Sequence, residues 1–232
     1  MIYIRKAQSR GHADFGWLNS YHTFSFGQYF DPAFNGFSVL RVINDDRVAP
    51  GQGFGTHAHD NMEIISYVLD GSLEHKDSMG NGSVIHLGEV QRLSAGSGIT
   101  HSEFNGSKTE PVHFLQMWII PDSKNVEPSY AQIDFNELMD SSDFVLAASK
   151  EGIEGSISIH QDAKMYLSRL PKAKGDLAVD ESRQQWVHLA CGTVTLNGKA
   201  LSAGDGAAIK QESSLPFSDA QNAELVIFDL PG

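Results

Sequence analysis

Cysteine is nearly absent from this chain of 232 residues, in which Cys191 is the one thiol. A single cysteine excludes an internal disulfide and any zinc site built from several thiolates. Apolar runs are also short, and none approaches the ~20 residues that a membrane-spanning helix needs. The first ten residues alternate apolar and polar side chains and lack the apolar stretch of a signal peptide. We therefore expect a soluble protein of the cytoplasm.

Positive charge is scarce, with 17 Lys and Arg residues against 29 Asp and Glu residues and a net charge of −12. Sequence-independent binding to nucleic acids or to anionic membranes requires a basic surface, so both are excluded as direct partners. A hydrophobic content of 41% with 20% charged residues is ordinary for a folded globular chain. The composition thus predicts an acidic globular protein.

Helical periodicity is limited to residues 134–139, where one or two turns are expected. Short segments of alternating apolar and polar residues, bounded by glycines, predict strands instead. Asn81-Gly82 and Asn197-Gly198 predict hairpin turns, because both central positions of such turns need positive φ. The fold class is therefore all-β, with its clearest strands expected at 37–43, 62–69, 113–120, 185–190, 192–196 and 224–228.

Two halves of the chain resemble distant copies of one β-domain. Val68-Leu-Asp-Gly-Ser-Leu73, followed by Gly88-Glu89, is echoed by Leu189-Ala-Cys-Gly-Thr-Val194, followed by Gly204-Asp205. Each copy predicts a strand, a glycine turn, a second strand and a Gly-acidic turn. Between the copies, residues 121–128 are polar and contain two prolines. We predict two β-sandwich domains, at 1–121 and 149–232, joined by a connecting segment at 122–148.

Two pairs of ligand-type side chains are the candidate site. His57 and His59 are two residues apart, as are His101 and Glu103, and both pairs lie near glycines. Side chains at i and i+2 of a strand share one face, roughly 7 Å apart at the backbone. Either pair alone is a frequent surface coincidence, but together they predict a metal site. A nitrogen and oxygen donor set favours a first-row ion such as Fe(II), Mn(II), Ni(II), Cu(II) or Zn(II).

These residues carry a resemblance to a known family. Gly51-x5-His57-x-His59-x3-Glu63 resembles the first motif of the cupin superfamily, and the run from Gly88 to His101 resembles the second. The second motif has serine in place of proline, and its histidine lies two residues late. In these departures the run Gly-Glu-Val-Gln-Arg-Leu-Ser-Ala-Gly-Ser-Gly-Ile-Thr-His-Ser-Glu from Gly88 to Glu103 resembles the pirin family. The C-terminal half is similar to the shorter bacterial pirins in length and pattern alone.

The resemblance implies a bicupin, two jelly-roll domains in tandem, with one metal ion in the first. In pirins the ligands correspond to His57, His59, His101 and Glu103, whereas most cupins use the glutamate at position 63. We favour Glu103, and Glu63 stays open as the alternative fourth ligand. His75 and Asp77 are a further candidate pair, although turn chemistry accounts for Asp77. The C-terminal domain has no comparable set, and we expect it to be degenerate and structural.

Pirins are associated with quercetin 2,3-dioxygenase activity, so the resemblance implies an oxidoreductase that opens the central ring of quercetin-like flavonols. The implied partners are the flavonol and dioxygen, and carbon monoxide is released. Fe(II) is the first expectation for the ion, with Zn, Mn, Ni, Co or Cu as alternatives, and Glu103 is the expected general base. One alternative is a regulatory protein that binds a protein partner according to the redox state of its metal. Another is a zinc cupin acting as an isomerase or hydrolase.

Aromatic residues are concentrated near the N-terminus, where nine of the chain's 22 fall between positions 15 and 37. We expect most of them to pack in the core or over the mouth of the domain. The alternative function is that part of this segment forms a wall for a flat aromatic ligand beside the metal.

Overall fold

A computed structural model describes residues 1–170 and 175–232, and nearly all of its regular structure is strand. No helix in these two ranges is long and apolar enough to span a membrane. The chain forms two compact units, an N-terminal unit of residues 11–134 and 159–161 and a C-terminal unit of residues 1–10, 135–158 and 162–232. The all-β class predicted from the sequence is confirmed.

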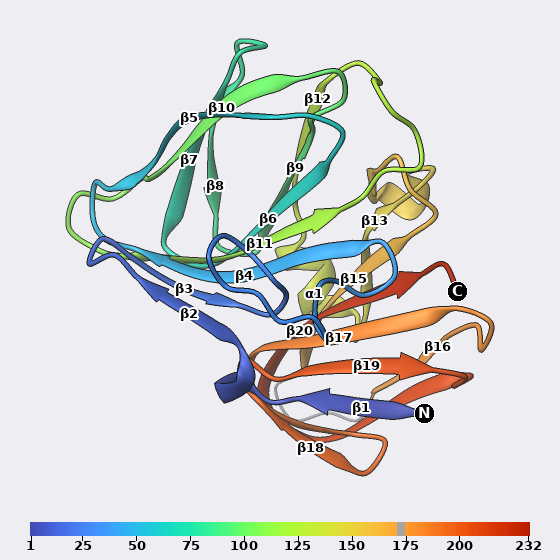
Figure 1. The fold of residues 1–232 in the computed structure, drawn as a ribbon. Helices are drawn as coiled ribbons and strands as arrows, with labels where there is room; N and C mark the ends of the chain where they lie inside the picture. The colour runs from blue at the N-terminus through green and yellow to red at the C-terminus, as the bar shows by residue number, and fades with distance from the viewer. Residues whose placement is uncertain (171–174) are drawn as a thin grey trace. The chain divides into compact units, whose positions relative to one another are not determined.

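The N-terminal unit consists of two antiparallel sheets (Figure 1). Its larger sheet has seven strands in the spatial order β12 (Ser129–Asp134), β9 (Glu89–Ser94), β6 (Glu63–Asp70), β11 (Val112–Ile119), β4 (Leu40–Val48), β3 (Leu18–His22) and β2 (Gly11–Asp14). Its smaller sheet has four strands in the order β5 (Gly53–His59), β10 (Ile99–Asn105), β7 (Ser72–Asp77) and β8 (Gly82–His86). This is the sandwich expected for the first domain.

Apolar side chains from both sheets form the core of the N-terminal unit. Val68 and Phe114 from the larger sheet pack with Leu73 and Ile85 from the smaller one, and all four are fully buried. Because side chains alternate between the two faces of a strand, residues that share a face with Val68 also point toward the smaller sheet. We call this the inner face, and it carries Ser66 on β6 and Gln116 on β11.

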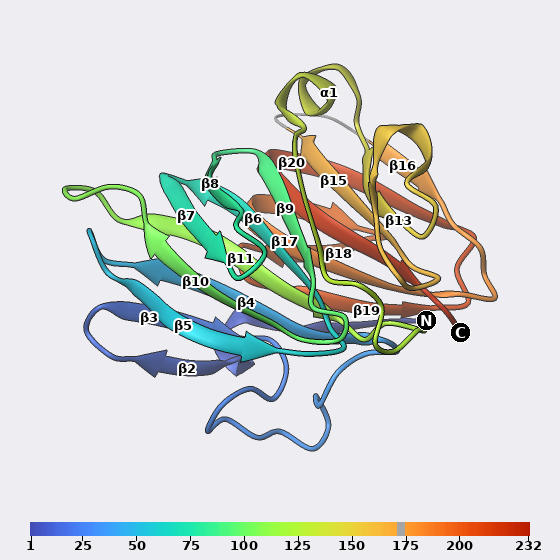
Figure 2. The same cartoon turned by 90° about the horizontal axis from the view of Figure 1, so that it is seen from above.

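The described strands of the C-terminal unit form one sheet. Its order is β1 (Ile2–Arg5), β19 (Gly206–Lys210), β17 (Gln184–Leu196), β20 (Ser214–Leu230), β15 (Lys164–Leu170), β13 (Val145–Ser149) and β14 (Ile157–Ser158), with β16 (Gly175–Ala178) on β20 and β18 (Lys199–Ser202) on β17. Figure 2 shows β15, β17 and β20 side by side. Helix α1 (Asn136–Ser141) confirms the short helix expected at 134–139. In the described residues, two 3-10 turns complete the elements, at Ala7–Ser9 and Ile153–Gly155.

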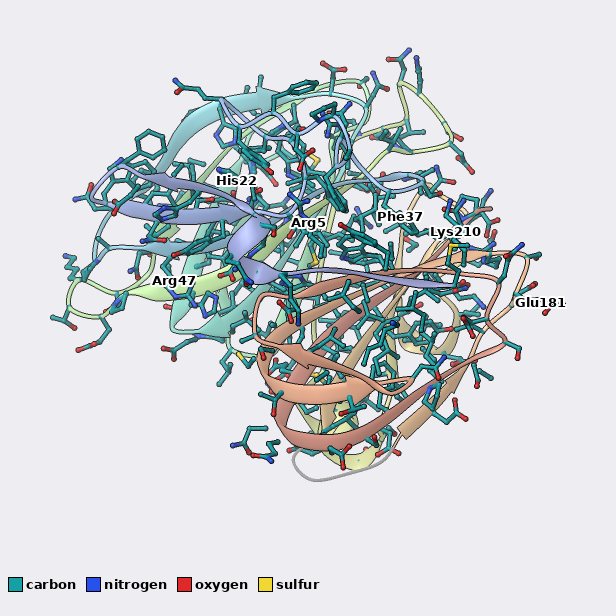
Figure 3. The ribbon with its side chains drawn as sticks, turned by 60° about the horizontal axis from the view of Figure 1, so that its bottom comes forward. Arg5, His22, Phe37, Arg47, Glu181 and Lys210 are labelled. Atoms are coloured by element: carbon teal, nitrogen blue, oxygen red, sulfur yellow. The ribbon has the colours of Figure 1, made fainter. Side chains whose placement is uncertain are left out.

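The two compact units do not begin and end at the predicted boundaries, 121 and 149. The division into domains at those boundaries stays a prediction. Residues 1–10 belong to the C-terminal unit because β1 pairs with β19. The N-terminal ammonium group also donates 2.6 Å hydrogen bonds to the carbonyl oxygen of Lys210, labelled in Figure 3, and to the carboxylate of Glu212. Residues 129–134 belong to the N-terminal unit because β12 pairs with β9.

Two glycine turns differ from the sequence predictions. Gly192 does not end a strand but lies inside β17, with a φ of 75°, where the register with β20 shifts. Its positive φ creates a bulge instead of a turn. The hairpin of β7 and β8 turns through residues 78–81, and Gly80, with a φ of 96°, takes the left-handed conformation that was assigned to Asn81-Gly82. Asn197-Gly198 forms its predicted turn, with φ values of 44° and 74°.

Candidate metal centre

The structure brings together the three histidines that the sequence singled out. His57 lies directly opposite His101 in the antiparallel register of β5 and β10, and His59 lies opposite Ile99. The ring centroids are 4.4 Å apart for His57 and His101, 4.8 Å for His57 and His59, and 5.0 Å for His59 and His101. One nitrogen of each ring lies within 4.8 Å of the others. The two histidines of β5 thus lie beside His101 of β10.

The histidine cluster offers ring nitrogens that a metal ion can bind. Burial, followed by the neighbouring imidazoles, lowers the pKa of His59 to about 4 and that of His101 to about 3, so both rings are neutral at pH 7. Nδ1 of His57 donates a 2.8 Å hydrogen bond to the carbonyl oxygen of Gly55, which leaves the lone pair on Nε2. Nε2 of His101 is buried without a hydrogen-bond partner in the described chain. The residues therefore fit a divalent cation.

Glu103 is buried on β10 and is held by two donors from the inner face of the larger sheet. Ser66 Oγ donates a 3.2 Å hydrogen bond to Oε1, and Gln116 Nε2 donates a 2.7 Å hydrogen bond to Oε2. A carboxylate oxygen of Glu103 lies within 4.8 Å of ligand nitrogens of His75 and His101. The structure thus places Glu103 in a second group that shares His101 with the first. Its role as fourth ligand beside His57 and His59 stays a prediction.

His75 and Asp77 are more deeply involved than the sequence indicated. In the register of β7 and β10, Asp77 lies opposite His101 and His75 lies opposite Glu103. The side chains of His75 and Asp77 have no exposed surface. Burial opposes ionisation of Asp77, but hydrogen bonds from Asn81 and His75 and from backbone amides outweigh it and lower the pKa of this carboxyl. The sequence signal was a second His-x-acid pair just before a hairpin turn.

Glu63 points away from the histidine cluster. It precedes Ile64, whose side chain packs with Leu93, and alternation along β6 places Glu63 on the opposite face from Ser66. There Glu63 accepts a 2.7 Å hydrogen bond from Ser94 Oγ and lies 3.1 Å from Nδ1 of His160. His160 was expected to be isolated, and its contact with Glu63 within the N-terminal unit was not visible in the sequence.

A row of polar side chains crosses the inner face beside Glu103. Asp46 is fully buried, and burial, with the charges of Asp45 and Glu103 as smaller contributions, raises its pKa to about 7. Asn44 and Asp46 share a face of β4, and Oδ1 of Asn44 lies 2.9 Å from Nδ1 of His22, which Figure 3 labels. Sequence reasoning missed this row because β4 contains two consecutive acids, Asp45 and Asp46, which interrupt the alternation of apolar and polar residues expected of a strand.

Part of the aromatic segment reaches the metal centre, and part does not. The ring of Phe26 packs edge-on against Trp118 at 5.5 Å, and Trp118 packs edge-on against His59 at 5.0 Å. Phe24 is buried, whereas Phe15 and Phe30 are 65% and 71% exposed. Core packing therefore accounts for some of these residues, and Phe26 together with Trp118 forms an apolar surface beside His59.

The described part of the C-terminal unit carries no comparable cluster. Every group of three or more ligand-type side chains found in residues 1–170 and 175–232 belongs to the N-terminal unit. His188 on β17 is fully buried in the C-terminal unit, and Cys191, on the same strand, is half-buried. The structural role expected for this unit stays a prediction.

Two family models match the chain. Residues 3–119 match the model described as Pirin, and residues 146–230 match the model described as Quercetinase C-terminal cupin domain. The two matches confirm the tandem cupin fold that the resemblance implied.

Relatives match over the full length. The chain is 46% identical over 232 residues to a quercetin 2,3-dioxygenase of Escherichia coli K12, covering 100% of this chain and 99% of that protein. It is 36% identical to a putative quercetin 2,3-dioxygenase of Pseudomonas aeruginosa, covering 99% and 100%. A crystal structure of a bacterial pirin from E. coli in complex with nickel(II) superposes with a TM-score of 0.93 at 45% identity, covering 100% of this chain and 99% of that one. By sequence and by fold, the chain belongs to the pirin family.

Proposed function

We propose that His57, His59, His101 and Glu103 bind one divalent metal ion. Three imidazoles within 4.8 Å of one another, with the buried Nε2 of His101 unpartnered in the described chain, are the observation that carries this proposal. Glu103 lies beside His101, and its carboxylate would supply the oxygen ligand. The nickel(II) complex of the related bacterial pirin supports a divalent ion. Fe(II) is the ion we propose in the cell, because a nitrogen and oxygen donor set suits iron and the reaction below uses dioxygen.

The proposed activity is the oxidative ring opening of quercetin-like flavonols by dioxygen, with release of carbon monoxide. Its main support is the full-length, 46% identical relative named quercetin 2,3-dioxygenase. The regulatory alternative has no such support among the relatives named above. We further propose that a flavonol is the physiological substrate. We also propose that the protein is located in the cytoplasm, and a chain with a single cysteine is compatible with that reducing compartment.

The side chains around the cluster have separable roles in this reaction. A bound divalent ion would act as a Lewis acid that makes a substrate hydroxyl more acidic. Glu103 would accept the hydroxyl proton on a carboxylate oxygen, and Ser66 and Gln116 orient that carboxylate. Phe26 and Trp118 would contact the flat aromatic rings and exclude water from that side of the site.

Turnover of quercetin tests this function. Oxygen consumption and carbon monoxide release are measured for the wild-type protein, His101→Ala and Glu103→Gln, in air and without oxygen. We expect turnover by the wild type in air alone and a large loss in both variants. His86→Ala, at an exposed histidine of β8, is the matched control and keeps wild-type activity. Equal rates in wild type, His101→Ala and Glu103→Gln would refute the proposal.

A further inference from the structure

Asp77 is positioned to act only as a hydrogen-bond acceptor. Its Oδ1 accepts hydrogen bonds from the backbone amides of Met79, at 2.9 Å, and Asn81, at 3.1 Å. Its Oδ2 accepts a 2.9 Å hydrogen bond from Nδ2 of Asn81 and lies 3.1 Å from Nε2 of His75. A carboxylate surrounded by donors on both oxygens has no proton to give. Nε2 of His75 is therefore the donor in this contact.

The protonation of His75 determines that of its neighbour. With a proton on Nε2, neutral His75 has its lone pair on Nδ1. That Nδ1 lies 3.5 Å from Nδ1 of His101, at the outer limit of a hydrogen bond. Because His75 can only accept here, the proton between the two nitrogens belongs to Nδ1 of His101. The lone pair of His101 is then on Nε2, the buried nitrogen that lacks a partner in the described residues.

We propose that His75 is a positioning residue, and that the contacts Asp77 to His75 to His101 hold His101 as its Nδ1–H tautomer with Nε2 directed at the metal. This inference rests on the proposed metal-binding role of His101. Such outer partners of a ligating histidine fix its ring orientation and its tautomer, and their loss typically weakens metal binding about 10- to 100-fold. His57 obtains the same protonation from the Gly55 carbonyl oxygen, so the two opposed rings present equivalent nitrogens.

Tyr130 packs against the His75 ring and helps to fix its position. The ring of Tyr130 on β12 packs against it with a centroid separation of 5.1 Å, and the Tyr130 hydroxyl is hydrogen-bonded to Ser83 and donates to Gln132 at 2.7 Å. His75 thus lies between Tyr130 and His101, whose ring centroid is 5.3 Å away. A residue held on both sides can impose an orientation on the ring that it contacts.

A competing role for His75 is direct ligation, because its ligand nitrogen lies within 4.8 Å of those of His101 and Glu103. The two roles are exclusive at one nitrogen. A lone pair of His75 Nδ1 that accepts the proton of His101 is not available to an ion, and an ion at this position would displace that proton. Tautomer measurements and ligand counting therefore distinguish them.

The first test uses metal-free protein with 15N-labelled histidine. Long-range 1H–15N correlation spectra report which ring nitrogen carries the proton, without any metal or flavonol. We expect the Nε2–H form for His75 and the Nδ1–H form for His101. In His75→Phe and Asp77→Asn, His101 should change to a mixture of tautomers, whereas His86→Phe on β8 should leave it unchanged. An Nε2–H form of His101 in the wild type, or an unchanged His101 in both variants, would overturn the inference.

The second test measures Ni(II) binding in the same proteins. The dissociation constant should rise about 10- to 100-fold in His75→Phe and Asp77→Asn and stay constant in His86→Phe. X-ray absorption spectra should show the same number of imidazole ligands in wild type and His75→Phe, and the loss of one imidazole would identify His75 as a ligand and overturn the proposal. If the tautomer and Ni(II)-binding results are as expected but the wild-type protein does not turn over quercetin, the proposed activity is contradicted and the positioning role of His75 is not.

Discussion

Gln116 on β11 donates a 2.7 Å hydrogen bond to Oε2 of Glu103 on β10, and so joins the two sheets of the N-terminal unit at the metal centre. Glu103 is 1% exposed, so the carboxylate depends on protein donors where water is absent. Gln116 and Ser66 are the two side-chain donors that hold this carboxylate.

Replacing Gln116 with Met removes this donor and keeps the side-chain length. We expect Ni(II) affinity to fall by about 10-fold or more, because a carboxylate that loses its hydrogen bond is less well oriented. Stability should fall by about 1–3 kcal/mol, the cost of leaving a buried acceptor unpaired. The measurements are metal titration and urea unfolding, with Gln221→Met, at an exposed position of β20 in the C-terminal unit, as control. Unchanged affinity in Gln116→Met would show that the contact does not position Glu103.

Asp46 makes stability depend on pH. Its pKa is about 7 in the folded state, against 3.8 as the ordinary value. Well below pH 3.8 this carboxyl is protonated in both the folded and the unfolded state, and it costs no stability. As pH rises toward 7 the unfolded state ionises first, so stability is lost progressively, on the order of a few kcal/mol. Asp46→Asn removes this loss, and its gain in melting temperature over wild type should grow from pH 4 to pH 7.

The control for Asp46→Asn is the same change at the exposed Asp176, in the other unit. Thermal unfolding of the wild type and both variants is followed across that pH range. A constant difference between Asp46→Asn and wild type would contradict the raised pKa of Asp46.

The two glutamates of the sequence analysis should differ in their effect on metal binding. Glu63 faces Ser94 and His160, so Glu63→Gln should change the Ni(II) dissociation constant by less than about twofold while lowering stability by about 1 kcal/mol. Glu103→Gln should weaken binding by at least about 10-fold. Competition titrations with a chelator measure both. The opposite order would assign the oxygen ligand to Glu63.

Metal binding should stabilise the folded chain. An ion that binds the folded state alone adds about 2.7 kcal/mol at a free concentration 100 times its dissociation constant. Ni(II) should therefore raise the melting temperature of the wild type, and a chelator should reverse the shift. His86→Ala should keep the shift and His101→Ala should lose it. A shift of equal size in His101→Ala would place the ion elsewhere.

Local patterns predicted the features that depend on neighbouring residues. The i, i+2 spacing was enough to predict that His57 and His59 lie on the same face of a strand, because side chains alternate between the two faces. The Asn197-Gly198 turn was predictable because asparagine and glycine tolerate the positive φ that both residues adopt there. The family resemblance then supplied the fold and the position of Glu103 among the candidate ligands.

Features that depend on pairing between distant strands could not be predicted in this way. His75 reaches His101 because β7 and β10 pair in a register that no local pattern specifies. Gly192 shows the same limit, because a glycine with positive φ serves a turn or a bulge equally well, and the partner strand β20 decides. Asp46 acquires its raised pKa from burial among residues of other strands.

The most direct test is diffraction from metal-loaded crystals, with anomalous data collected at the absorption edge of the bound metal. The account predicts one ion bound by Nε2 of His57, Nε2 of His101, a ring nitrogen of His59 and a carboxylate oxygen of Glu103, with coordination positions left for substrate. An ion located between His75 and His101, or one enclosed entirely by protein ligands, would contradict it.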